Sequence, residues 1–303
     1  MLSIMTSVRN SRDNTRNFLS SLKVMFTLAD IEVEFLLIDD NSNESDGVIE
    51  LFLDFRKSLK ADVRIYRFKK HQQYCVAFAL GLSEAKGDHV IFISNDMIVT
   101  LAFLNILMRV ADKDEKIGVV RGTSQYTDTH PNYSCLPPLP IRNYKDTVDF
   151  AEYVSKYYGD NFVEDQILIG DAVLIKREVI NTIGVFDTRY YGYFGDIDYG
   201  VRAKRAGFKL VCAKGAWLYH DGAGSFRQDV VDKKADPEVL RKNRVWSIQR
   251  AYSEFRKKWD TSLPEYYPGA VAIDFKSIIE KENVDIDEYQ EPIKASDFDC
   301  ELI

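Results

Sequence analysis

Short apolar runs alternate with stretches of helical spacing through the first half of the chain, and this alternation constrains the fold more than any other feature. The runs that predict strands are Leu2–Val8, Val33–Ile38, Val63–Phe68, Val90–Ile93 and Gly118–Gly122. The stretches that predict helices are Thr15–Leu28, Val48–Leu59 with Asp46 as its N-cap, Tyr74–Ala85 and Leu101–Val110. Strands that alternate with helices in this way form a mostly parallel sheet covered on both faces. We therefore predict an α/β fold, whose ligands would bind at the carboxyl ends of the strands.

The second half of the chain is less regular. Tyr126–Tyr144 contains four prolines and predicts a long loop. The elements expected beyond it are helices at Thr147–Tyr157 and Ile197–Ala206, the latter closed by Gly207, and strands at Ile167–Lys176, Phe208–Cys212 and Trp217–His220. A charged amphipathic helix, Val239–Trp259, follows, and the last ~20 residues are acidic enough to predict disorder. We predict an α/β domain over residues 1–225 and a helical C-terminal extension over 226–303.

The composition excludes several classes of protein. The 303 residues carry a net charge of −7, which disfavours nucleic-acid binding because that function favours a basic surface. The four cysteines form no CxxC pair, so we expect neither a disulfide framework nor a zinc site. The sequence has neither a signal-peptide pattern nor the ~18–20 consecutive apolar residues of a membrane span. We therefore expect a cytoplasmic protein, with peripheral membrane contact and a homodimer left open.

Polar side chains follow two of the predicted strands. Ser94-Asn95-Asp96 comes directly after Val90–Ile93, where a carboxylate can hold Mg²⁺ or Mn²⁺ against a diphosphate, because hard cations prefer oxygen ligands. Asp39-Asp40 follows Val33–Ile38 and can hydrogen-bond a nucleotide base or a ribose hydroxyl. A plain turn explains either cluster as well, because Asn and Asp favour turns.

Further candidates lie near the predicted helix Ile197–Ala206 and beyond it. Asp196 comes at the start of this helix, where its carboxylate can cap the helix or take a proton from an acceptor hydroxyl. Asp198 can bind substrate, or pair with Arg202 one turn further on. His220 ends a predicted strand, where a lone histidine is more often structural than a ligand. It precedes Gly222–Ser225, a loop that could close over a bound diphosphate.

Taken in this order, these segments resemble the family 2 inverting glycosyltransferases of GT-A fold. The resemblance runs from Leu2 to about Ser225. It rests on six pieces: Leu2–Asn10 (LSIMTSVRN), Phe35–Ser42 (FLLIDDNS), Glu84–Val90 followed by Ile93–Asp96, Gly170–Asp187 with Gly184 and Phe186, Asp196–Arg202, and Tyr219–Ser225.

The resemblance implies a donor site and a metal site. Thr6, Ser7 and Arg9 would line the nucleotide of a nucleotide-diphosphate sugar, and Asp39 would read the base. Asn95 and Asp96 match the DxD-type positions, so Asn95 would contact the nucleotide and Asp96 would be the main ligand of Mn²⁺ or Mg²⁺. His220 would be a further metal ligand. The chain departs from the family at Ser94 and Asn95, which leave only one carboxylate in this triplet.

The resemblance also implies a catalytic base and a substrate side. Asp196 matches the base that deprotonates the acceptor. Asp198, Gly195 and Tyr193 would lie toward the acceptor or the sugar, and Gly195 stands where the family has the Glu of an ED pair. The aromatic segment Tyr190–Phe194 suits sugar rings, although the same side chains could pack the core.

The function that these residues imply is metal-assisted transfer of a sugar, with inversion, from a UDP- or dTDP-sugar to a glycan or lipid-linked acceptor in polysaccharide biosynthesis. A non-catalytic sugar-nucleotide or glycan-binding protein of the same fold is the alternative. A dinucleotide oxidoreductase is disfavoured because no GxGxxG opens a helix after a strand. A nucleotidyltransferase is disfavoured because the segment Thr6–Arg12 lacks the glycines of a phosphate loop.

Overall fold

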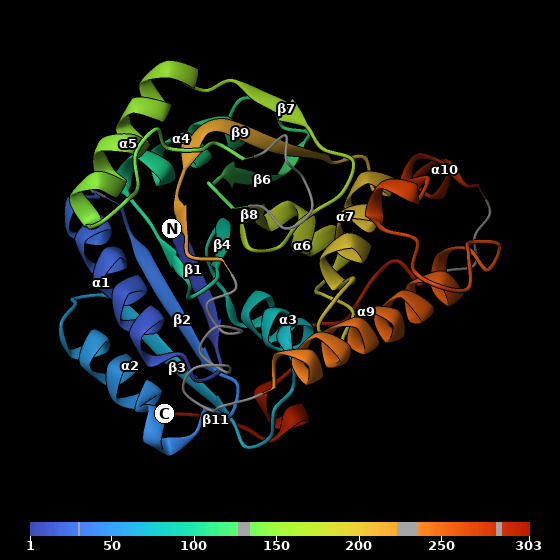
Figure 1. Cartoon of the computed structure of the whole chain (residues 1–303), viewed down its shortest axis with the longest axis horizontal. Coiled ribbons are helices and arrows are strands. Elements are labelled where there is room, and N and C mark those ends of the chain that lie inside the picture. The colour runs from blue at the N-terminus through green and yellow to red at the C-terminus, as the bar shows by residue number, and fades with distance from the viewer. Residues whose placement is uncertain (30, 127–133, 223–235, 283–286) are drawn as a thin grey trace.

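A nine-stranded sheet forms the centre of the protein, in a computed structural model that describes residues 1–29, 31–126, 134–222, 236–282 and 287–303. The strand order is β11-β3-β2-β1-β4-β8-β6-β9-β7. Six of these nine strands run in one direction, and β8, β7 and β11 run against them. The sheet is therefore mostly parallel, as predicted, with helices on both faces (Figure 1).

The bounds of the elements follow the predicted alternation through the first half. The strands are β1 Leu2–Val8, β2 Val33–Asp39, β3 Asp62–Phe68, β4 His89–Ile93, β6 Ile117–Thr123, β7 Phe162–Glu164, β8 Ala172–Lys176, β9 Lys209–Trp217 and β11 Cys300–Leu302, with β5 Met97–Ile98 and β10 Tyr219–His220 in a separate two-stranded sheet. The helices are α1 Arg12–Leu28, α2 Val48–Lys57, α3 Tyr74–Glu84, α4 Leu101–Ala111, α5 Tyr144–Tyr158, α6 Arg177–Ile183, α7 Gly195–Arg205, α9 Pro237–Trp259 and α10 Phe275–Glu280.

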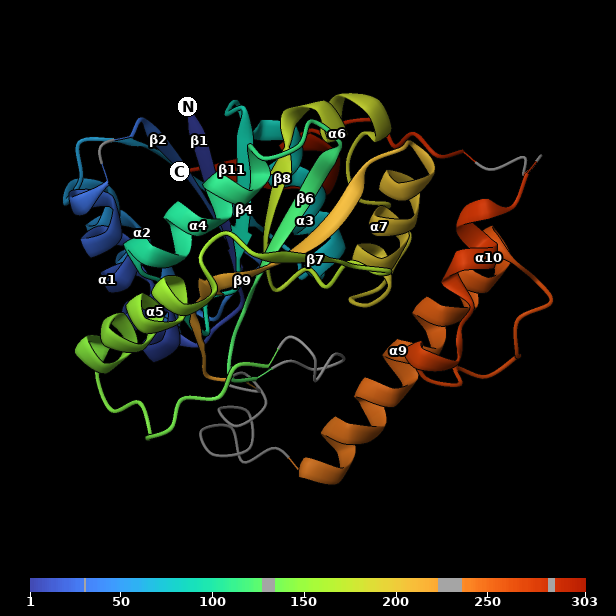
Figure 2. The same ribbon diagram turned by 90° about the horizontal axis from the view of Figure 1, so that it is seen from above.

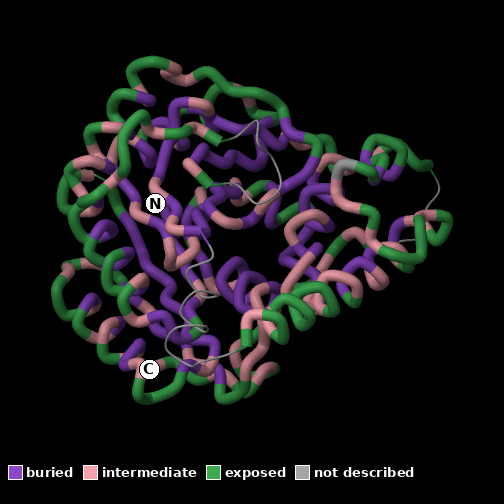
Figure 3. The backbone as a smooth tube through the Cα atoms, in the orientation of Figure 1, coloured by how far each residue is buried: buried purple, intermediate pink, exposed green. Residues whose placement is uncertain are grey.

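Alternate residues of the central strands fill two separate cores. In β2, Phe35 and Leu37 pack with side chains of α1, α2 and α4, whereas Leu36 and Ile38 pack with side chains of α3, α6 and α7. Successive side chains of a strand point to opposite faces, so a continuous apolar run is what a strand covered on both sides requires. Figure 3 shows the buried strands at the centre of the molecule and exposed residues around the rim.

Several predicted boundaries differ from the structure. Only the second half of Ile167–Lys176 is a strand, because β8 is limited to the residues that pair with β4 and β6. The predicted strands Phe208–Cys212 and Trp217–His220 are instead the single long strand β9 followed by β10, since residues up to Trp217 continue to pair with β6. Helix α2 has Gly47 rather than Asp46 as its N-cap, in a left-handed conformation with φ 57°.

The C-terminal part contains helices, as predicted, but its end belongs to the central sheet. Helix α9 packs against the region of α7 through Tyr252, Phe255 and Trp259, and Figure 2 shows it projecting from the sheet. The last residues, for which the sequence predicts disorder, form β11, which pairs with β3 at the edge of the sheet. The carbonyl of Ile303 also accepts a hydrogen bond from Arg56, so backbone pairing orders a segment that its acidic composition suggested was unfolded.

Candidate active site

The polar clusters predicted at strand ends do come together, because β1, β2 and β4 are parallel neighbours. Val8 pairs with Asp39 at the ends of β1 and β2, and Ser94 follows the last residue of β4. The carboxyl ends of parallel strands meet at one edge of a sheet, which is where ligands bind in open α/β folds. Strands β1, β2 and β4 lie side by side (Figure 1), so the structure gathers the Asp39-Asp40 and Ser94-Asn95-Asp96 clusters at one edge of the sheet.

Asp96 and His220, which the resemblance assigns as metal ligands, face each other. Met97 pairs with His220 across β5 and β10, and the amide of Asp221 donates to the carbonyl of Asp96. These contacts hold the Nε2 atom of His220 3.4 Å from the Oδ2 atom of Asp96. Burial lowers the pKa of His220, but the nearby carboxylates of Asp96 and Asp171 outweigh burial and raise it overall.

The separation of these two side chains is compatible with a shared divalent cation. Two ligand atoms that are each about 2.1 Å from a metal ion, with their bonds to it at right angles, lie about 3 Å from each other. Among the described residues, no three His, Cys, Asp or Glu side chains form a metal cage. A magnesium-type site does not need one, because this ion is commonly held by one or two carboxylates together with substrate phosphates.

Asp171 is a charged residue at this site that sequence reasoning missed. Its carbonyl accepts a hydrogen bond from the amide of Ser94, next to the pair formed by Ile93 and Ala172. Its Oδ2 atom lies 3.8 Å from the Nδ1 atom of His220. An ionisable residue directly before a short strand is the sequence signal that could have indicated this position. The predicted strand Ile167–Lys176 was too long, however, and contained Asp171.

Asp196 lies in the first turn of α7 and lines a cavity of about 290 Å³. Its Oδ2 atom accepts a hydrogen bond from the amide of Gly170 (3.1 Å), and its Oδ1 atom accepts one from the amide of Ile197 (2.9 Å). The helix N-cap is Phe194, in a left-handed conformation with no side-chain cap, so Asp196 does not take the capping position. Burial raises the pKa of Asp196 to about 6, although these backbone hydrogen bonds oppose the shift.

The Asp196 cavity also reaches residues close to Asp96 and His220, the two candidate metal ligands. Ser94 and Asp171 line it on one side, and Tyr193, Arg244 and Tyr267 line it on another. A carboxyl group with a pKa near neutrality, in a cavity wide enough for a small substrate, has the properties of a general base. Tyr193, predicted to lie toward the substrate, lines this cavity, and its contact with substrate stays a prediction.

Asp39 lines a second cavity, of about 210 Å³, together with Asn43, Glu44 and Arg67. Asp39 is fully buried, and burial raises the pKa of its carboxyl. Its Oδ1 atom accepts a hydrogen bond from the amide of Ser42, while Oδ2 has no hydrogen-bond partner and lies 3.4 Å from Arg67 Nε. Such a buried acceptor suits a donor on a ligand. The adjacent Asp40 instead binds the amides of Gln72 and Gln73.

The other residues predicted to contact the nucleotide differ in how exposed they are and in which polar atoms are already bonded. Thr6 is buried in β1, and its hydroxyl has no hydrogen-bond partner, whereas Ser7 is half-buried and Arg9 is exposed. The side-chain amide of Asn95 donates to the hydroxyl of Thr15 in α1. Ser7 and Arg9 are therefore accessible, Thr6 is closed off by packing, and Asn95 retains its side-chain oxygen and one amide N–H for a ligand.

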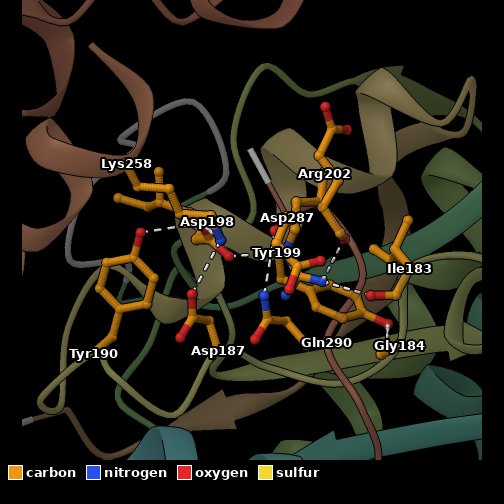
Figure 4. A network of polar contacts seen from close by, with 12 residues as sticks. Ile183, Gly184, Asp187, Tyr190, Asp198, Tyr199, Arg202, Lys258, Asp287 and Gln290 are labelled. Atoms are coloured by element: carbon orange, nitrogen blue, oxygen red, sulfur yellow. Dashed lines mark hydrogen bonds and ion pairs between the residues drawn. The ribbon is translucent and has the colours of Figure 1, made fainter. Parts of the chain in front are cut away.

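Asp198 is a structural residue, which corrects the prediction that it contacts substrate. It is fully buried, and its carboxylate contacts four donors: Tyr190 Oη, Trp259 Nε1, Arg202 Nε and Lys258 Nζ. Figure 4 shows Lys258, Tyr190 and Arg202 converging on Asp198. The alternative that Asp198 pairs with Arg202 is confirmed, at 2.9 Å. This network joins α7 to the end of α9.

Gly195 is also structural, because it is buried and does not line the Asp196 cavity. A Cβ atom at this position would lie 2.4 Å from the Sγ atom of Cys75. Burial does not favour the predicted substrate contact at Gly195, which stays a prediction, and the close approach of α3 leaves no room here for a glutamate side chain. The Gly222–Ser225 loop and the loop Tyr126–Tyr144 lie partly outside the described residues.

The fold matches solved structures of glycosyltransferases. Residues 1–349 of TarS from S. aureus superpose with a TM-score of 0.53 at 12% identity, covering 86% of this chain and 73% of that one. The mannosyltransferase PcManGT from Pyrobaculum calidifontis, solved in complex with GDP-Man and Mn²⁺, gives a TM-score of 0.52 at 14% identity, with 84% and 74% covered. The topology and its strand-end site define the class as a GT-A glycosyltransferase fold.

The family follows from sequence. The model of glycosyl transferase family 2 matches residues 3–184, more than half of the chain, and the chain belongs to this family. The O-antigen biosynthesis protein RfbC of Myxococcus xanthus is 23% identical over 249 residues, which cover 76% of this chain. The matched region spans only 18% of RfbC's length. No helix in the described part of the chain is long and apolar enough to cross a membrane.

Proposed function

We propose that this chain transfers a sugar, with inversion, from a nucleotide-diphosphate donor to a hydroxyl acceptor, with Asp196 as the general base. The observation that carries the proposal is the placement of the Asp196 carboxyl. It has a pKa of about 6 and lines a cavity that also reaches Ser94 and Asp171, beside the pair formed by Asp96 and His220. The proposed base therefore lies in a cleft whose lining residues adjoin the candidate diphosphate site.

In this mechanism, Asp196 takes the proton of the acceptor hydroxyl as its oxygen forms a bond to the anomeric carbon. The bond from that carbon to the diphosphate oxygen breaks on the opposite face, which inverts the configuration. The amides of Gly170 and Ile197 bind the two carboxylate oxygens and so orient the base. General-base assistance of this kind contributes about 10²–10⁴-fold to the rate.

Asp96 and His220 would hold Mn²⁺ or Mg²⁺, because a carboxylate and an imidazole 3.4 Å apart fit adjacent positions on such an ion. When bound, the cation would neutralise the charge that develops on the leaving diphosphate. PcManGT, which shares the fold, was solved with Mn²⁺ and a nucleotide sugar.

The Asp39 cavity would take the base of the donor. The buried Oδ2 atom of Asp39, which has no hydrogen-bond partner, offers an acceptor for a base N–H, and Arg67 beside it offers a donor for a base carbonyl oxygen. A pyrimidine such as uracil or thymine presents this N–H and C=O pair side by side. Guanine presents the same pair, so the cavity suits a UDP-, dTDP- or GDP-sugar, and of these we propose a UDP- or dTDP-sugar as the donor that the family resemblance implies.

The acceptor would enter the Asp196 cavity between Tyr193 and Tyr267, whose rings can pack on a sugar. Similarity to RfbC, an O-antigen biosynthesis protein, supports a role in surface-polysaccharide synthesis. A lipid-linked or free glycan acceptor is consistent with this role.

The donor site is tested by thermal shift with UDP, dTDP and GDP, each with and without Mn²⁺. A ligand at about 100 times its Kd stabilises the protein by about 2.7 kcal/mol. We expect a Mn²⁺-dependent shift with UDP or dTDP that is reduced in Asp39→Asn and Asp96→Asn. As a control, Asp160→Asn removes an aspartate that pairs with Arg109 away from the strand ends and should retain the full shift.

The possible results separate the proposal from its alternative. The absence of any shift with all three nucleotides would contradict the donor site. A nucleotide shift without release of nucleotide from any nucleotide sugar would instead favour the non-catalytic binding protein. The loss of carboxylates at Ser94 and Asn95, with the Asn95 amide tied to Thr15, is what keeps that alternative open.

A further inference from the structure

Asp171 is brought to the site by strand pairing alone. Ile93 pairs with Ala172 in the antiparallel β4–β8 ladder, and the amide of Ser94 donates to the carbonyl of Asp171 at 2.9 Å. Both residues line the Asp196 cavity. The ladder therefore puts a carboxylate beside the triplet position at which this chain has a serine.

The side chain of Asp171 is directed at His220. Its Oδ2 atom lies 3.8 Å from the Nδ1 atom of His220, and the carbonyl oxygen of Tyr126 lies 3.2 Å from the same nitrogen. The other ring nitrogen, Nε2, lies 3.4 Å from Asp96. The two nitrogens thus have separate partners. At Nδ1 the Tyr126 carbonyl is within hydrogen-bond distance and the Asp171 carboxylate lies just beyond it, whereas Nε2 faces the candidate metal ligand Asp96.

The other oxygen of the Asp171 carboxylate, Oδ1, has contacts of its own that hold the side chain in place. Its Oδ1 atom accepts a hydrogen bond from the amide of Ala172 at 2.9 Å. The same oxygen lies 3.6 Å from the Nη2 atom of Arg121, a buried residue of β6. Arg121, Asp171, His220 and Asp96 therefore form a row of side chains in which each lies within 4 Å of the next.

We propose that Asp171 is a positioning residue. Its carboxylate, next to the Tyr126 carbonyl that accepts from Nδ1, favours the tautomer and ring orientation of His220 in which the lone pair of Nε2 is directed at the cation beside Asp96. This inference rests on the proposed function, in which Asp96 and His220 hold the metal. Acceptors bound to the second nitrogen of a metal-ligating histidine set its tautomer and ring orientation, and their loss lowers metal affinity about 10–100-fold. Asp171 contacts neither metal nor substrate in this role.

The test is Mn²⁺ affinity, measured on the full chain with Mn²⁺ alone by the electron paramagnetic resonance signal of the free ion. Asp171→Asn keeps the shape of the side chain and an oxygen for the amide of Ala172, so it should fold. We expect its Kd for Mn²⁺ to rise about 10–100-fold. Asp160→Asn, at a half-buried aspartate that also pairs with an arginine, should bind Mn²⁺ like the unaltered protein.

A double-mutant cycle distinguishes positioning from direct ligation. If Asp171 acts through His220, then Asp171→Asn should have little effect on the Mn²⁺ affinity of a His220→Ala variant. An equal loss of affinity in both backgrounds would overturn the positioning role. Wild-type affinity in Asp171→Asn would overturn it as well. If Asp171→Asn melts early, Asp171→Ser, which is smaller and uncharged, takes its place in the same cycle.

Failure of this inference is distinguishable from failure of the proposed function. Asp96→Asn and His220→Ala should each weaken Mn²⁺ binding if the metal pair is real. Unchanged Mn²⁺ binding in both of these variants would contradict the metal pair itself. Weakened binding in both, together with wild-type binding in Asp171→Asn, would contradict only the role of Asp171.

Discussion

Replacing Asp198 by alanine should lower the free energy of unfolding of the protein, and not merely weaken substrate binding. The carboxylate is fully buried and contacts Arg202, Lys258, Tyr190 and Trp259. Removing it leaves the charges of Arg202 and Lys258 in a buried region without this partner. Breaking a buried ion pair from one side costs about 3–5 kcal/mol.

The cost converts into a measurable change in melting temperature. At about 2.1 cal mol⁻¹ K⁻¹ per residue, unfolding this 303-residue chain has an entropy of about 0.64 kcal mol⁻¹ K⁻¹. A loss of 3–5 kcal/mol then lowers the melting temperature by about 5–8 °C. The partner Lys258 also contacts the buried carboxylate of Asp187, which limits the loss toward the lower figure.

The assay is thermal unfolding followed by circular dichroism in the absence of any ligand. Asp160→Ala is the control, since its partly exposed pair with Arg109 should contribute about 1 kcal/mol or less. A melting temperature for Asp198→Ala equal to that of the unaltered protein, combined with lost substrate binding, would refute the structural role. It would restore the substrate contact that the sequence suggested.

Three further predictions follow from other contacts. Turnover should fall as the pH drops through about 6, because Asp196 must be ionised to act as a base. The same raised pKa means that this carboxyl lowers stability as the pH rises from about 4 to 6, so the urea midpoint of the unaltered protein should drop relative to that of Asp196→Asn over this range; parallel midpoints would contradict the raised pKa. Gly195→Ala should lower the free energy of unfolding by about 1–3 kcal/mol, because its Cβ atom would lie 2.4 Å from the Sγ atom of Cys75, and adding Cys75→Ala should recover part of that loss. Equal urea midpoints for Gly195→Ala and the unaltered protein would contradict the contact. Deleting residues 300–303 should lower the melting temperature while nucleotide binding persists, since β11 pairs with β3 at the sheet edge; an unchanged melting temperature would show that this pairing contributes nothing.

The sheet of the first half was predictable because its signals are local. Apolar runs such as Val33–Ile38 are continuous where helices cover both faces, and the helices between them show their own spacing. Strand β11 carried no such signal. Its three residues include a glutamate, and they are ordered by backbone pairing with β3 and by the packing of Cys300 against the core, which are contacts with distant parts of the chain.

The positions of the candidate side chains were predictable where a motif falls at the end of a strand, as at Asp96, or at the start of a helix, as at Asp196. Residue roles that depend on distant partners were not. Asp198 resembles an accessible carboxylate in the sequence, but Trp259 and Lys258, some 60 residues further on, enclose it. Asp171 reaches the site only because β8 is inserted antiparallel between β4 and β6, a pairing that no local pattern encodes.

The most direct test of the central claim is the release of nucleotide from a nucleotide sugar by Asp196→Asn, compared with the unaltered protein under the same Mn²⁺ concentration. The variant keeps the size of the side chain, so the account predicts an unchanged thermal shift with the nucleotide diphosphate and a turnover lowered by about 10²–10⁴-fold. Turnover equal to that of the unaltered protein, with the same nucleotide bound, would contradict the assignment of Asp196 as the catalytic base.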